Sequence, residues 1–270
     1  MPPVLTAALP LIIWDSIFLN TGAIITFSSE DANKPVSNLS DFFLNTFWGP
    51  TSADQSGDSS SHVRIELSSN VDIDTLVIGN HDLFTAGADV TLNWHPTNAF
   101  ASPNPIVSFT PTDDENQYQR FSVQNRQFLE LVFDNTASQF SIGQIMLTEA
   151  LEMERRPIDG FSMLHQIARL ETLTTKKGQY IAAVLEWVNR GLLLDFEDLS
   201  NDFVFGDLKS YIDNSFLLGR PVFLIPDLTN FAEFIFYLHP IDNPDADFPS
   251  NAQRYNFSLP LEGAKQGLTT

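Results

Sequence analysis

The chain has 270 residues, which is enough for two ordinary domains, and its 43% of apolar residues predicts a well-filled core. Its net charge of −20, from 34 acidic and 14 basic residues, excludes sequence-specific nucleic-acid binding, because phosphate recognition requires clustered lysine and arginine. An uninterrupted apolar run long enough to span a bilayer is also missing, so we expect no membrane insertion.

Signatures of catalysis are missing as well. There is no cysteine, which rules out disulfides, a thiol nucleophile and cysteine zinc sites. Phosphate-binding loops, nucleophile elbows and zinc-protease motifs do not occur, and the five histidines are scattered. We interpret the acidic clusters at Asp113–Glu115 and Asp242–Asp247 as solvated loops. The sequence therefore predicts a protein that is not an enzyme, with no catalytic residue, cofactor or metal site.

The first half predicts short strands separated by polar turns. The opening run from Val4 lacks a basic start and contains Pro10 and Asp15, so we expect no signal peptide. Alternating or β-branched segments indicate strands over Leu11–Leu19, Ala23–Phe27, Val63–Leu67, Leu76–Ile78, Arg120–Val123, Phe128–Phe133 and Ile142–Leu147. Several short strands at this spacing predict a sandwich or jelly roll.

A cluster of charges followed by proline at Leu151–Pro157 marks a domain boundary. We predict one domain over 1–152 and a second over 153–270. The second domain opens with strands at Ala168–Thr172 and Tyr180–Val188, with Gly178 in the turn between them. Compact apolar segments predict further strands at 221–226, 234–238 and 254–262.

The second half also predicts one helix, over about 201–218. Ser200–Asp202 provides cap candidates, and Gly219 provides a C-terminal stop. Apolar residues recur between them at helical spacing, namely Val204, Leu208, Tyr211, Ile212 and Phe216. We expect Leu208 and Ile212 to face a sheet and Lys209 to face away from it.

A turn motif in the first half carries a family resemblance. Asn38-Leu-Ser-Asp41, followed by Thr46-Phe-Trp48, resembles the opening of galactose-binding-like jelly rolls of the discoidin (F5/8 type C) kind. The resemblance covers about residues 12–150 and implies a jelly-roll β-sandwich. A carbohydrate-binding function would require accessible aromatic rings, for which the candidates are Trp48, Trp94 and Tyr118.

The second half, over about 160–264, is similar to tail-tube-like domains of tailed-phage tail-tip and distal-tail proteins. The similarity lies in the strand Gln179–Val188, the helix after Asp195–Asp198 and the segment Gly219–Asp227. It implies a tail-tube-like β domain with one helix, in a homo-oligomeric ring (a trimer or hexamer) around the tail channel. The candidate assembly contacts are Phe223, Phe234 and Phe236.

The main hypothesis is therefore a mainly β structural component of a bacteriophage tail tip or baseplate, made in the host cytoplasm and located in the virion, with other tail proteins as partners. One alternative is a carbohydrate-binding module, either for a host receptor or lectin-like, without catalytic activity. The other is a glycosidase or depolymerase, for which no pair of carboxylates stands out.

Overall fold

The computed structural model describes residues 9–20, 22–51, 61–134, 137–157, 166–174, 180–226, 235–242, 245–247 and 254–263. The fold is mainly β, as the sequence predicts. The chain divides into two compact units: the first contains Ile13–Ala150, and the second contains Leu9–Ile12 together with Leu151–Thr270. The segment Leu9–Ile12 therefore belongs to the second unit. The predicted domains, 1–152 and 153–270, would place this segment in the first.

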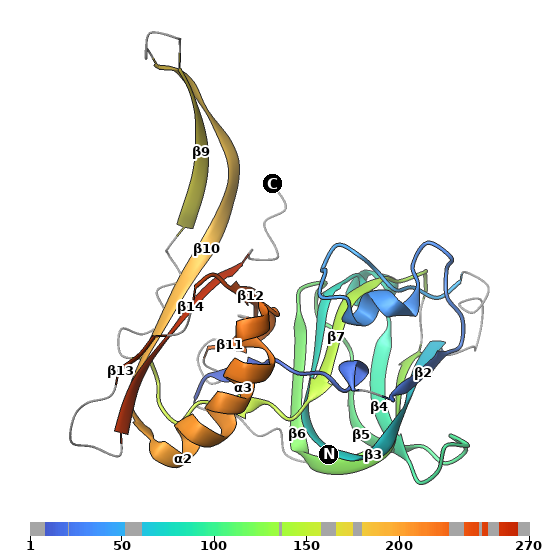
Figure 1. Cartoon of the computed structure of the whole chain (residues 1–270). Coiled ribbons are helices and arrows are strands. Elements are labelled where there is room, and N and C mark those ends of the chain that lie inside the picture. The colour runs from blue at the N-terminus through green and yellow to red at the C-terminus, as the bar shows by residue number, and fades with distance from the viewer. Residues whose placement is uncertain are drawn as a thin grey trace. The chain divides into compact units, whose positions relative to one another are not determined.

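The first unit is a β-sandwich (Figure 1). Its six strands belong to one hydrogen-bonded sheet with the order β2-β3-β6-β4-β5, in which β7 pairs with β3. Its strands are β2 (Ile24–Phe27), β3 (Ser61–His81), β4 (Asp89–His95), β5 (Asn104–Phe109), β6 (Gln117–Asp134) and β7 (Ile142–Thr148). Its short helical turns are η1 (Ile17–Leu19), η2 (Val36–Ser40) and α1 (Leu83–Ala86).

Two long strands, β3 and β6, contribute to both layers of this sandwich. Their first pairing segment, Ser61–Glu66 of β3, lies beside β2 on its other edge, and the later segment Thr75–His81 lies beside β7. The pairing of β3 with β6 shifts register between Glu66 and Val71. Val63 and Ile65 are buried before this shift, whereas Ser68–Asn70, within it, are exposed. The polar segment thus forms a corner at which one strand passes from one layer to the other.

The turn motif that precedes Trp48 is closed by its own side chains. Asn38 donates from Nδ2 to the carbonyl oxygen of Phe47 at 2.9 Å. The Asp41 carboxylate accepts hydrogen bonds from the Phe43 N–H at 2.8 Å and from the Thr46 hydroxyl at 2.7 Å. These bonds hold the chain so that Trp48 enters the core, where it is 0% exposed.

The second unit contains an eight-stranded antiparallel sheet with the order β8-β1-β11-β12-β14-β10-β9, and with β13 paired to β14. Its strands are β1 (Leu11–Ile13), β8 (Leu151–Glu152), β9 (Gln166–Thr174), β10 (Tyr180–Ser200), β11 (Val222–Ile225), β12 (Phe236–Pro240), β13 (Asp245–Asp247) and β14 (Arg254–Gly263). The first part of β10 pairs with β9 and the later part with β14, so the β9–β10 hairpin extends beyond the other strands of this sheet (Figure 1).

The predicted helix is confirmed over Asn201–Leu218. It consists of α2 (Asn201–Phe203), the π-helical turn η4 (Val204–Leu208), α3 (Lys209–Asn214) and the 3-10 turn η5 (Phe216–Leu218). The Ser200 hydroxyl caps it by accepting the Phe203 N–H at 3.2 Å. Gly219 ends it with a φ of 66°, a conformation that glycine adopts without steric cost. Leu208 is buried, and Lys209 is exposed and pairs with Asp213, as the predicted helix phase requires.

The strand predictions are wrong at two places in the first half. Leu11–Leu19 is not one strand: β1 ends at Ile13, and the Ser16 hydroxyl caps the η1 turn that follows. The strand predictions also omit β4 and β5. The predicted turn residue Gly178 lies outside the described residues.

Candidate functional site

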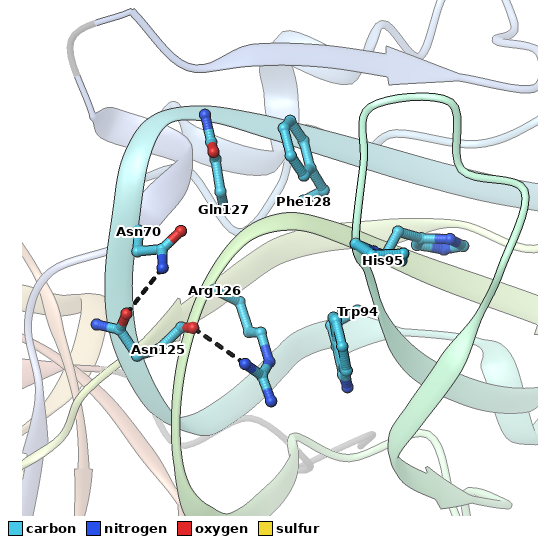
Figure 2. Close-up of a pocket in the computed structure, with 8 residues that line it drawn as sticks. Asn70, Trp94, His95, Asn125, Arg126, Gln127 and Phe128 are labelled. Carbon is cyan, nitrogen blue, oxygen red and sulfur yellow. Dashed lines mark hydrogen bonds between the residues drawn. The ribbon is translucent and has the colours of Figure 1, made fainter.

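The first unit carries a pocket at the corner of the sandwich, beside the end of β4. Its volume is about 180 Å³. It is lined by side chains from β3, β4, β6 and the start of the β4–β5 loop (Figure 2), namely Asn70, Trp94, His95, Pro96, Asn125, Arg126, Gln127 and Phe128. Aromatic, amide and cationic groups therefore meet in one small space.

Trp94 reaches the pocket because it is the last residue of an alternating pattern in β4. Val90 and Leu92 are fully buried in the core, and Trp94 continues the same series two residues later, near the end of the strand. The indole packs against the core and is only partly buried. The strand thus anchors an aromatic ring at the border between the core and the solvent.

The Arg126 guanidinium lies over the Trp94 ring, 4.0 Å from its centroid. Nη1 donates to the main-chain oxygen of Asn125 at 3.3 Å, and Nη2 donates to Oε1 of Gln124 at 3.2 Å. Both acceptors are neutral. Cation–π stacking and these two bonds fix the plane and the position of the guanidinium before any ligand enters.

A row of amide side chains forms the side of the pocket next to Arg126. Asn70 donates from Nδ2 to Oδ1 of Asn125 at 3.0 Å, and Asn125 donates in turn to Asp72 at 2.8 Å. Gln127 donates to the main-chain oxygen of Leu67 at 2.8 Å. The amides of Asn70 and Asn125 are exposed and already oriented by this chain of bonds, which suits them to recognise hydroxyl groups.

A buried polar network supports the pocket from the neighbouring face of the sheet. Glu130 accepts a hydrogen bond from Nε of Arg64 at 2.6 Å and lies 3.0 Å from Nε2 of His95. Phe100, from the β4–β5 loop, packs edge-on against His95 and Phe128, with ring centroids 5.0 Å and 6.3 Å away. The network fixes His95 and Phe128, which line the pocket, in place.

The three residues predicted to contact carbohydrate lie in different surroundings. Trp94 lines the pocket. Trp48 is 0% exposed and packs against Phe133 and Phe140 in the core, so a ligand cannot reach its ring. Tyr118 lies on β6 opposite Val77 of β3, away from the pocket residues, and is half-buried. Trp94 alone of the three is therefore placed in the candidate site.

The residues predicted to mediate assembly lie in the second unit. Phe223 and Phe236 are on β11 and β12 and are 0% and 7% exposed, and Phe223 packs against Tyr237 with ring centroids 4.8 Å apart. Their rings are thus used within the unit and offer almost no surface to another copy. Phe234 lies outside the described residues.

In the described part of the chain, no cluster of three or more histidine, aspartate or glutamate side chains is arranged to hold a metal ion. None of its helices is long and apolar enough to cross a membrane.

Comparison with known proteins identifies no family: no family model matches the sequence, and no curated protein matches it. Among solved structures, a GH29 fucosidase of Ruminococcus gnavus in complex with fucose gives a TM-score of 0.43 at 11% identity, covering 51% of this chain and 27% of that one. A chitosan-binding module of a chitosanase/glucanase from Paenibacillus sp. IK-5 gives 0.41 at 15% identity, covering 49% and 98%. A Clostridium perfringens carbohydrate-binding module in complex with GalNAc-β-1,3-galactose gives 0.38 at 14% identity, covering 47% and 94%.

All three TM-scores lie below 0.5, so neither the fold nor the function of this chain rests on these similarities. The chain also spans little more than a quarter of the fucosidase. The sandwich is defined by its own strand order, and the candidate site by its own contacts.

The sequence does not predict most of the residues that line the pocket. Asn70, Asn125 and Arg126 belong to no motif, and they meet only because β3 and β6 bend at the same corner. A usable signal does exist for Trp94: the alternation Val90, Leu92, Trp94 predicts a strand with an aromatic ring on its core side at the end.

Proposed function

We propose that the first unit binds carbohydrate, without catalysing a reaction, and that the corner pocket is its binding site. The observation that carries this proposal is the meeting of Trp94 with the fixed guanidinium of Arg126 and with the amides of Asn70 and Asn125. A pyranose ring has an apolar C–H face and a polar rim of hydroxyls. An aromatic wall beside oriented donors and acceptors complements both.

The size of the pocket supports a single sugar unit. Its volume of about 180 Å³ is smaller than the roughly 300–1,000 Å³ typical of pockets that enclose drug-sized ligands. An oligosaccharide would place one residue in the pocket and leave its neighbours at the surface. We expect modest affinity, because a single small unit buries little surface.

The test is isothermal titration with glycans selected on an array, using the wild type and two pocket variants. Trp94→Ala should weaken binding at least about tenfold, because it removes the aromatic wall. Asn125→Ala, at an exposed position, should weaken it about three- to tenfold through the lost hydrogen bonds. Binding of no glycan at all, or undiminished binding by both variants, would refute the proposal.

Phe109→Ala is the matched control for Trp94→Ala. Phe109 lies on β5 and packs, half-buried, against the same core without lining the pocket. The Phe109→Ala variant should have a lower thermal midpoint of unfolding, as Trp94→Ala does, and an unchanged glycan affinity. Loss of binding in both variants would show that Trp94→Ala abolishes binding by unfolding the protein.

Assembly into a ring is a second proposed function, and it concerns the second unit. The supporting observation is β9, a nine-residue strand at the edge of the sheet in the described part of the chain. An edge strand of this length offers unpaired main-chain groups to another copy. The phage-tail location and the tail-protein partners stay predictions. Electron microscopy of purified rings, or of a virion, would test them, and a monomer that joins no particle would contradict them.

A further inference from the structure

Arg126 carries a charge that the described part of the protein does not neutralise. Arg64 pairs with Glu130, Arg120 with Asp74, and both Arg155 and Arg254 with Asp198. Among the described residues no carboxylate pairs with Arg126, although the chain has 34 acidic residues and 14 basic ones. Its guanidinium donates to the neutral oxygens of Asn125 and Gln124 instead.

The guanidinium retains donors for a ligand. It has five N–H groups in a rigid plane, and Nη1 and Nη2 use one each for Asn125 and Gln124. Stacking on Trp94 holds this plane at the pocket, so a carboxylate entering it would lose little rotamer entropy of the arginine on binding. A charge-assisted bond of this type is about twice as strong as a bond between neutral groups.

We infer that the pocket selects acidic saccharides, in which a sugar unit bears a carboxylate, and that Arg126 is the specificity-determining residue. This inference rests on the proposed carbohydrate binding and adds the class of ligand. The carboxylate pairs with the free Nη hydrogens of Arg126, and the sugar hydroxyls bond to the amides of Asn70 and Asn125. The net charge of −20 repels a polyanion at long range, so the selection is local to this arginine.

The test begins with an array that carries neutral, carboxylated and sulfated glycans. Wild-type protein should bind the carboxylated class most strongly. The strongest carboxylated glycan is then titrated as the free acid and as its methyl ester, which differ in charge and little else. We expect the acid to bind at least about tenfold more tightly than the ester, since loss of a charge-assisted pair at this site removes the selective contact.

Three variants test whether Arg126 causes the preference for the acid over the ester. Arg126→Gln should bind acid and ester with equal affinity, and Arg126→Lys should keep part of the preference for the acid, because lysine retains the charge and loses the planar fork. Arg155→Gln, in the second unit and half-exposed, is the control and should behave as the wild type. A preference that persists in Arg126→Gln would overturn the inference.

Different results would contradict the selection of acidic saccharides and carbohydrate binding itself. Equal affinity for acid and ester in the wild type, or a preference for sulfated glycans, with binding still lost in Trp94→Ala, would overturn the acidic selection alone. Absence of binding to every glycan class would overturn both.

Discussion

At the scale of single residues, His81 is a buried titratable group outside the pocket. It ends β3, it is 5% exposed, and its Nδ1 accepts the main-chain N–H of Leu83 at 3.3 Å. Burial lowers the pKa of His81 from 6.5 to about 4, and the nearby carboxylates Asp114 and Asp113 oppose this shift without cancelling it. The folded protein therefore holds this histidine neutral at pH values where the unfolded chain protonates it.

The sign of the pH effect follows from these two pKa values. Between pH 6.5 and 4 the unfolded chain binds a proton at His81 that the folded chain does not bind, so the free energy of unfolding falls as the pH falls. Asp82 and Asp134 act in the opposite direction, because burial raises their pKa values and protonation then favours the folded state. Wild type and variant must therefore be compared at each pH.

We predict that His81→Gln removes the acid sensitivity contributed by this residue. Urea unfolding at pH 7 and at pH 4.5 should show the wild type losing about 2–3 kcal/mol more than the variant over this interval. Glutamine keeps an acceptor for the Leu83 N–H and has no proton to gain. Equal losses in wild type and variant would show that His81 is not held neutral by burial.

Trp48 and Trp94 illustrate how position in the fold determines the use of the same side chain. Trp48 forms an isolated β-bridge with Ile142, and the main-chain N–H of Trp48 donates to the main-chain oxygen of Ile142 at 2.8 Å. This bridge fixes the backbone so that the indole is fully buried. Trp94 instead lies near the end of β4, at the corner of the sandwich, where part of its side chain stays accessible.

At the scale of elements, the helix of the second unit shows a clear division between its two faces. Leu208 and Tyr211 are 1% and 0% exposed, whereas the side chains of Lys209 and Asp213 are about half exposed and pair with each other. Ile212 is half-buried and lies between these two faces. The apolar face supplies the stabilisation, since an exposed ion pair at this spacing contributes only about 0.3–0.5 kcal/mol.

Leu208→Ala should therefore lower the free energy of unfolding of the second unit by about 2–5 kcal/mol, the range for truncation of a buried leucine. Lys209→Ala should change it by less than about 0.5 kcal/mol. Chemical denaturation followed by circular dichroism measures both values. Similar effects of the two substitutions would mean that the helix packs in a different phase.

At the scale of the whole molecule, the second unit depends on a strand from near the N-terminus. Leu11 and Ile12 of β1 pair with Glu152 and Leu151 of β8, and β1 also adjoins β11 in the sheet. Both β1 residues are 0% exposed. This pairing joins parts of the chain about 140 residues apart, as the numbering of the partners shows.

We predict that Ile12→Ala destabilises the second unit by about 2–5 kcal/mol and leaves the first unit largely unaffected. Hydrogen exchange followed by mass spectrometry reads the two units separately. Peptides from β11 and β14 should exchange faster in the variant, whereas those from β4 and β6 should not. Faster exchange in β4 and β6 alone would assign β1 to the other unit.

The sequence predicts local structure well and contacts between distant segments poorly. Alternation in Val63–Leu67 and Phe128–Phe133 predicts parts of β3 and β6, because burial of one face imposes a period of two. The exposed polar corner of β3 at Ser68–Asn70 breaks that period, so the two halves of the strand do not read as one. The pocket is formed by this corner and by Arg126, and neither leaves a pattern in the sequence.

Carbohydrate binding at the corner pocket is tested most directly by the indole N–H signals in a ¹⁵N–¹H spectrum during glycan titration. The chain has four tryptophans, so few signals need assignment, and Trp94→Phe identifies the one from the pocket. Trp48 serves as the internal reference because it is fully buried. The Trp94 signal should shift until it reaches saturation, while the Trp48 signal stays in place. A titration in which the bound glycan leaves the Trp94 signal unchanged would contradict carbohydrate binding at the corner pocket.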